Sequence, residues 1–141
     1  ARRPMRYEIL DHTADQAIRA GGHDLRELIE NAAAGMVALL YGGRPPAAER
    51  EVALSVAADG AELVLHHALR ELLYLLEDEG LAPVAVRVVA ADAEGAKLQV
   101  GVVPRAQAEP VLRALLKAVT RHGLQIQRSG DTSSVTVVFD V

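Results

Sequence analysis

Residues 24–40 have the sequence DLRELIENAAAGMVALL, and this stretch determines much of the fold. Its apolar residues recur at intervals of three and four, the spacing of one face of an α-helix. Asp24 precedes the first apolar residue and Glu27 follows three positions later, as in a capping box. Gly42 supplies a stop signal. We therefore predict a helix over residues 25–40 with one apolar stripe. The stripe comprises Leu25, Leu28, Ile29, Ala32, Ala33, Met36, Val37 and Leu40.

A second helix is predicted over residues 61–78, with Asp59 as its N-cap and Glu62 as the capping partner. Gly80 follows as a stop signal. The apolar stripe of this helix comprises Leu65, Leu69, Leu72, Leu73 and Leu76. Two amphipathic helices can each cover one apolar face of a sheet.

Alternating β-branched residues between turn signals predict strands. The expected strands are 6–10, 16–20, 51–57, 84–90, 97–103, 124–128 and 134–140. Turns at 92–95 and 129–132 make hairpins of the last four. Residues 110–119 are ambiguous, because their composition slightly favours a helix and their β-branched end favours a strand. The pattern predicts an α+β fold, two amphipathic helices packed on β-sheet(s) as a sandwich, in a single domain over residues 1–141.

Composition excludes several classes of protein. The 141 residues contain no cysteine, so disulfides and thiolate metal sites are impossible. Aromatic residues make up only 3% and the net charge is −4, which disfavours direct binding of nucleic acid. The apolar runs are too short for a membrane span, and the basic N-terminus lacks an apolar signal-peptide core. We therefore expect a cytoplasmic protein without membrane association.

The loop with the sequence LDHTAD at 10–15 holds two carboxylates and an imidazole within five residues. Carboxylates suit Ca²⁺ and Mg²⁺, and a histidine also suits Mn²⁺ or Zn²⁺. The same residue types commonly bond their own backbone in turns, so the loop alone leaves both interpretations open. At the other end of the sequence, Asp140 stands beside the terminal carboxylate of Val141. A cation would relieve their repulsion, and a solvated chain end is the alternative.

Two further polar groups favour ordinary structural roles. The stretch KAVTRHG at 117–123 could meet phosphate, although a polar edge of an ordinary element is the simpler interpretation. His66 and His67 lie in the second predicted helix, and we interpret them as partly buried, hydrogen-bonded residues. The chain lacks the GxGxxG, Walker A and GxSxG motifs and the HExxH zinc motif, so no standard catalytic signature is present.

Several of these segments together resemble the archease family. They are YEILDHTAD at 7–15, DLREL at 24–28, LRELLY at 69–74, KAVT at 117–120 and VFDV at 138–141. Their order and spacing match that family over nearly the whole chain. The combination of DHTAD, KAVT and a closing FDV is specific.

The resemblance implies a function. Archeases are small cytoplasmic proteins that are not enzymes themselves. They assist the tRNA-splicing RNA ligase, which joins 2′,3′-cyclic phosphate and 5′-hydroxyl RNA ends. They promote guanylylation of the ligase's active-site histidine and so sustain multiple turnover. The implied protein partner is therefore this RNA ligase, and the implied cofactor is a divalent metal.

The resemblance also assigns site residues. Asp15 and Asp140 are implied as the principal metal ligands. Asp11, His12 and the terminal carboxylate of Val141 would be neighbours or additional ligands, with Lys117 nearby. Oxygen ligands suit Ca²⁺, Mg²⁺ and Mn²⁺ alike, so the identity of the metal stays open.

The family pattern assigns residues 115–120 to a strand, against the slight local preference for a helix. Two departures from the pattern concern partner contacts. Arg121 stands where an aromatic residue is common, and residues 101–112 lack the usual acidic and histidine-containing character.

Two other functions stay open at this stage. One is a general chaperone or modulator of RNA-modifying enzymes in which the metal is purely structural. The other is a metal-dependent hydrolase using Asp11, His12 and Asp15, which would lack a clear base and nucleophile pair.

Overall fold

The computed structural model describes residues 6–10 and 15–141, and within them it shows two antiparallel sheets and three helices. The predicted α+β class is confirmed. In chain order the elements are β1 (Tyr7–Leu10), β2 (Gln16–Gly22), α1 (Leu25–Tyr41), β3 (Arg50–Ala57), α2 (Ala61–Glu77), β4 (Leu81–Asp92), β5 (Gly95–Pro104), α3 (Arg105–Ala108), a 3-10 turn (Glu109–Val111), β6 (Ala118–Val119), β7 (Gln127–Ser129) and β8 (Thr132–Asp140).

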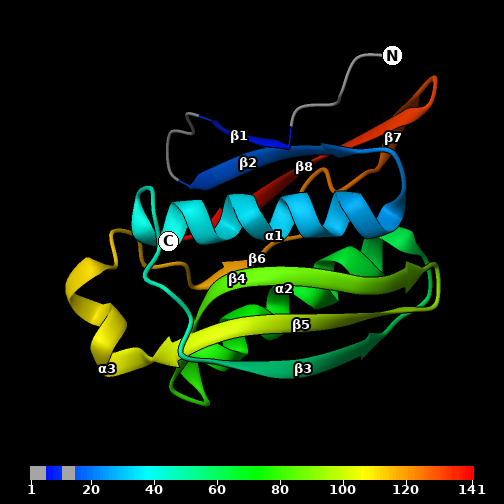
Figure 1. The fold of residues 1–141 in the computed structure, drawn as a ribbon. Helices are drawn as coiled ribbons and strands as arrows, with labels where there is room; N and C mark the ends of the chain where they lie inside the picture. The colour runs from blue at the N-terminus through cyan, green and yellow to red at the C-terminus, as the bar shows by residue number, and fades with distance from the viewer. Residues whose placement is uncertain (1–5, 11–14) are drawn as a thin grey trace.

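The two sheets lie on either side of α1 (Figure 1). One sheet has the order β1-β2-β8-β6, and β7 also pairs with β8. The other has the order β3-β5-β4. Helix α1 packs against β2 of the first sheet and β4 of the second, and α2 contacts all three strands of the second sheet. Because β2 occupies one side of β8, the short strands β6 and β7 share its other side.

Helix α1 begins as the sequence predicts. The side chain of Asp24 accepts a hydrogen bond from the N–H of Glu27 at 2.8 Å. The carboxylate of Glu27 accepts from the N–H of His23 at 3.0 Å. Gly42 caps the other end in the left-handed conformation, with φ of 64°, which costs little for a residue without Cβ. The helix therefore ends at Tyr41, one residue beyond the predicted end.

The core joins side chains from both long helices and both sheets. Apolar side chains of this size contribute about 1.5–3 kcal/mol each when fully buried, so this cluster supplies the main stabilising term. The largest buried members are Phe139, Ile18, Leu28, Ile29, Met36, Leu40, Leu65, Leu69, Leu72, Leu98 and Leu116. None of the helices in the described part of the chain combines the length and apolar character that crossing a bilayer requires.

The predicted capping of α2 is wrong. Gly60, not Asp59, occupies the N-cap position, with φ of 107° and no side-chain cap. The N–H of Gly60 donates to the carbonyl of Ala93 at 2.8 Å, so the turn between β4 and β5 fixes the chain before α2. The carboxylate of Glu62 accepts from the N–H of Ile126 instead of closing a capping box.

The C-terminal third also differs from the prediction. The strand expected at 115–120 is reduced to β6, and the strand expected at 124–128 is replaced by β7 at Gln127–Ser129. The N–H groups of Arg113 and Ala114 donate to the carbonyl of Leu40, at 2.7 and 3.3 Å. This carbonyl lies near the C-terminus of α1, where no later helical N–H is available to it. The segment is thus held at the end of α1 before it reaches β8. The short helix α3 was not predicted.

Candidate functional site

Strand pairing brings three chain segments together at one end of the five-stranded sheet. Gln16 of β2 pairs with Phe139 of β8, and Asp15 directly precedes Gln16. Continuing this antiparallel register by one residue places the backbone of Asp15 beside that of Asp140. On the other side of β8, Ala118 pairs with Asp140. We call this end of the sheet the tip, formed by Asp15, Lys117, Asp140 and Val141.

Backbone hydrogen bonds fix Lys117 at the tip. Its N–H donates to the carbonyl of Asp140 at 2.8 Å. The N–H of Thr120 donates to the carbonyl of Val138 at 2.9 Å. These two bonds flank the two residues of β6. The KAVT segment predicted from the sequence therefore lies directly against the closing FDV segment.

The structure brings together some of the predicted site residues. Asp140 and Lys117 are exposed, Val141 is 46% exposed, and Asp15 is half-buried. Asp11 and His12 lie outside the described residues. Among residues 6–10 and 15–141, no group of three or more histidine or acidic side chains is arranged to hold a metal. At the tip, the described residues therefore bring together two carboxylate side chains, those of Asp15 and Asp140.

The donor chemistry of the tip fits a hard divalent cation. Carboxylate oxygens are preferred ligands of Ca²⁺, Mg²⁺ and Mn²⁺, and such ions take about six or more oxygen ligands. The carboxylates of Asp15, just before β2, and of Asp140, at the end of β8, would supply part of that set. The rest would come from water, from backbone carbonyls or from the 11–14 loop. Lys117 brings one positive charge to the same end of the sheet.

A buried histidine contacts β6, the strand that follows Lys117 of the tip. His66 of α2 is only 6% exposed, and its Nε2 lies 2.8 Å from the carbonyl oxygen of Val119 in β6. This confirms the interpretation of His66 as a partly buried, hydrogen-bonded residue. Because a carbonyl only accepts, Nε2 must carry the proton. Nothing in the sequence indicated this contact, since its two residues lie in segments far apart in the chain.

The environment of His66 favours the neutral imidazole. Burial lowers the pKa of His66, and the bond to the Val119 carbonyl opposes this by raising it. The nearby charges of Arg121, His67 and Arg70 lower the pKa of His66 further. The Nδ1 atom is buried and has no hydrogen-bond partner among the described residues.

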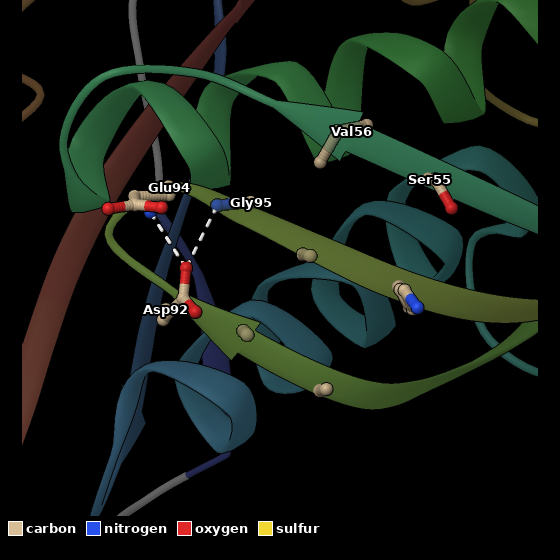
Figure 2. Close-up of a pocket in the computed structure, with 9 residues that line it drawn as sticks. Ser55, Val56, Asp92, Glu94 and Gly95 are labelled. Carbon is tan, nitrogen blue, oxygen red and sulfur yellow. Dashed lines mark hydrogen bonds between the residues drawn. The ribbon is translucent and has the colours of Figure 1, made fainter.

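A second pair of acidic residues is not comparable to the tip. Asp92 and Glu94 line a hollow at the turn between β4 and β5 (Figure 2). One carboxylate oxygen of Asp92 accepts from the N–H of Glu94 at 2.8 Å and from the N–H of Gly95 at 3.1 Å. Asp92 therefore stabilises the predicted hairpin turn, as aspartates commonly do.

Comparison with known proteins decides the family. The model of the Archease protein family (MTH1598/TM1083) matches residues 7–141. The chain belongs to the archease family. The archease of Archaeoglobus fulgidus is 31% identical over 137 residues, covering 97% of this chain and 100% of that protein. The archease of Thermococcus gammatolerans is 33% identical over 133 residues, covering 89% and 91% of the two chains.

Solved archease-type structures share the fold. The solution structure of Methanobacterium thermoautotrophicum protein 1598 aligns with a TM-score of 0.71 and 26% identity, covering 97% of this chain and 100% of that one. The crystal structure of an archease from Thermotoga maritima, described as a possible chaperone, aligns with a TM-score of 0.65 and 23% identity, covering 94% of each chain. The resemblance to archeases inferred from the sequence is therefore confirmed.

Proposed function

We propose that this archease is a metal-binding accessory protein that activates a tRNA-splicing RNA ligase. It would promote guanylylation of the ligase's active-site histidine and so permit multiple turnover, without catalysing a reaction itself. Its implied location is the cytoplasm. The observation that carries the proposal is the strand register that places Asp15, Lys117 and Asp140 at one end of the sheet.

Charge and exposure at the tip support an action on a partner's nucleotide site. The carboxylates of Asp15 and Asp140 would hold the cation, with Asp11, His12 and Val141 as further candidate ligands. A divalent cation bound there supplies positive charge that neutralises phosphate oxygens during nucleotidyl transfer. Lys117 is exposed beside Asp140, so its ammonium group can contact a phosphate on the partner.

The first experiment measures guanylylation of the RNA ligase from the same organism. The ligase is mixed with GTP, Mn²⁺ and a substoichiometric amount of the archease, and label transferred to the ligase is followed with time. Asp15→Asn and Asp140→Asn are compared with wild type. Glu51→Gln is the matched control, because Glu51 is an exposed carboxylate on β3 of the other sheet. Circular dichroism confirms that each variant folds.

We expect wild type and Glu51→Gln to stimulate guanylylation, and each tip variant to lose at least about 10-fold of that stimulation. Equal stimulation by all four proteins would overturn the role of the tip. Absence of stimulation by wild type would reject the ligase as partner. In that case the general chaperone function, with a structural metal, becomes the better account.

A further inference from the structure

We propose that His66 is a positioning residue for the tip. Its hydrogen bond to Val119 holds β6 between α2 and β8, and so keeps Lys117 in line with Asp140. The inference rests on the proposed function in taking the tip as the metal site. The contact that carries it is the Nε2–carbonyl distance of 2.8 Å between α2 and β6.

Strand β6 needs support beyond its own pairing. It contains two residues, Ala118 and Val119, and pairs with β8 on one side only. A two-residue pairing at the edge of a sheet adds few backbone hydrogen bonds, so its stability depends on another element packing against it. On the side away from β8, His66 of α2 provides the bond to the Val119 carbonyl. The imidazole thus takes the place that a further strand would occupy.

The position of Lys117 depends on this arrangement. Lys117 immediately precedes β6, and the preceding residues Arg113 and Ala114 are bonded to the end of α1. Lys117 thus lies between the bonds to Leu40 and strand β6. Its own N–H donates to the carbonyl of Asp140. Loosening β6 from α2 would free Lys117 and would also remove one neighbour of Asp140. Groups that orient a metal ligand in this way typically change metal affinity 10–100-fold when altered.

The identity of residue 66 also favours a specific role. His66 lies among the buried, mostly apolar residues of α2, such as Leu65 and Leu69. A leucine would fill this position without leaving a nitrogen unpaired, whereas Nδ1 of His66 is buried without a partner among the described residues. Buried polar side chains normally make at least one hydrogen bond. Here that bond is the one to Val119.

The test compares His66→Gln with His66→Asn. The amide nitrogen of glutamine reaches about as far as Nε2 of histidine and can donate to the Val119 carbonyl, whereas asparagine is one methylene shorter. Both variants place an uncharged amide at the buried position, so the cost of burying a polar group is similar in the two. His67→Asn is the control on the same helix, because Nδ1 of His67 faces the carbonyl of Ala57 at the end of β3, at 3.4 Å, rather than β6.

Two measurements are made on each full-length variant. Amide hydrogen exchange, followed by NMR without metal, reports on the N–H groups of Lys117 and Thr120, with Ile18 and Val137 in the β2–β8 pairing as internal references. Calorimetric titration with Mn²⁺ then measures metal affinity. We expect His66→Asn to accelerate exchange at Lys117 and Thr120 selectively and to weaken Mn²⁺ binding about 10-fold. We expect His66→Gln to keep the wild-type exchange rates at Lys117 and Thr120 and the wild-type affinity for Mn²⁺.

The outcomes separate this inference from the proposed function. Unchanged exchange at Lys117 and Thr120 in His66→Asn, or equal behaviour of the Gln and Asn variants, would overturn the positioning role. If His66→Asn does not fold, the His66→Gln variant decides the question. Normal exchange protection at Lys117 and Thr120 together with a loss of Mn²⁺ affinity in that variant would reject the coupling between β6 and the tip. If wild type binds no Mn²⁺, the metal site is rejected, and the exchange data still decide whether His66 holds β6.

Discussion

The carboxylate of Glu30 accepts a hydrogen bond from the backbone N–H of Val88 at 2.8 Å, joining α1 to the outer edge of β4. The guanidinium of Arg26 completes the contact by donating to the carbonyl of Val88 at 3.1 Å and to Glu30 at 3.2 Å. Two side chains one helical turn apart therefore satisfy both backbone groups of one edge residue. An edge strand without such partners presents unpaired groups to other chains.

Glu30→Ala should lower the free energy of unfolding by about 1–3 kcal/mol, because it removes the acceptor of the Val88 N–H. Glu30→Gln keeps an acceptor oxygen and should lose less. Urea denaturation monitored by circular dichroism measures both. Glu71→Ala is the control, because Glu71 pairs with Arg70 only at 4.0 Å and should cost less than about 0.5 kcal/mol. Equal losses in Glu30→Ala and Glu71→Ala would contradict the role of Glu30.

Tyr41→Phe should destabilise the protein by about 1–2 kcal/mol, because the Tyr41 hydroxyl donates to the carbonyl of Pro83 at 3.0 Å and both groups are buried. Burial raises the pKa of Tyr41 to about 12. The folded state thus favours the protonated phenol. This contribution is fully present below the unfolded pKa of about 10 and is lost as the pH rises through about 12.

The measurement is urea denaturation at neutral pH and between pH 9 and 11. The wild type should lose stability relative to Tyr41→Phe as the pH rises in that range. Tyr74→Phe, at a tyrosine that is 44% exposed, serves as control and should match the wild type in stability at neutral pH and in its loss at high pH. Parallel pH profiles of wild type and Tyr41→Phe would exclude a buried, hydrogen-bonded phenol.

The elements that the sequence predicted well are those set by local chemistry. Helix α1 begins where Asp24 can cap it and ends where Gly42 can adopt positive φ, and both devices lie within the helix's own sequence. The hairpin of β4 and β5 closes on Asp92, whose carboxylate bonds the turn that follows it. Such signals need no knowledge of the rest of the fold.

The predictions that were wrong failed through contacts with distant residues. The strand expected at 115–120 is shortened because Arg113 and Ala114 satisfy the carbonyl of Leu40 at the end of α1. The capping role expected of Glu62 is lost because its carboxylate bonds the N–H of Ile126. In both cases a local preference lost to a hydrogen bond that only the tertiary structure provides.

The tip could be predicted only through the family resemblance. The 10–15 loop and the closing Asp140 each had a plausible structural explanation, and nothing in their spacing placed them together. The pairing of β2 with β8 brings Asp15 next to Asp140, through a register that alternation alone cannot set. Lys117 joins them through β6. The sequence indicated a hydrogen-bonded His66, but nothing in it identified the carbonyl of Val119 as the partner.

Acidification should weaken the protein through His66. Burial lowers the pKa of His66 below the ordinary value of 6.5, so the unfolded chain takes up the proton first. The stabilising contribution is therefore fully present above about pH 6.5 and is lost as the pH falls towards and through the folded pKa. Urea midpoints between pH 7.5 and 5 should fall more steeply for wild type than for His66→Gln, which cannot titrate there. A His67→Gln variant should retain the wild-type dependence of the urea midpoint on pH. Loss of that dependence in His67→Gln would assign the effect to His67 and contradict the role of His66.

Divalent cations should stabilise the folded protein through the tip carboxylates. A ligand that binds only the folded state at 100 times its dissociation constant adds about 2.7 kcal/mol. For a domain of this size each kcal/mol raises Tm by about 2–4 °C, so a saturating cation should raise Tm by about 5–11 °C. Calorimetric scans with Ca²⁺, Mg²⁺ or Mn²⁺ at constant ionic strength, reversed with a chelator, measure this shift. Asp140→Asn should reduce it by more than half and Glu51→Gln should leave it unchanged. An equal shift in wild type and in Asp140→Asn would mean that the cation binds elsewhere on the molecule.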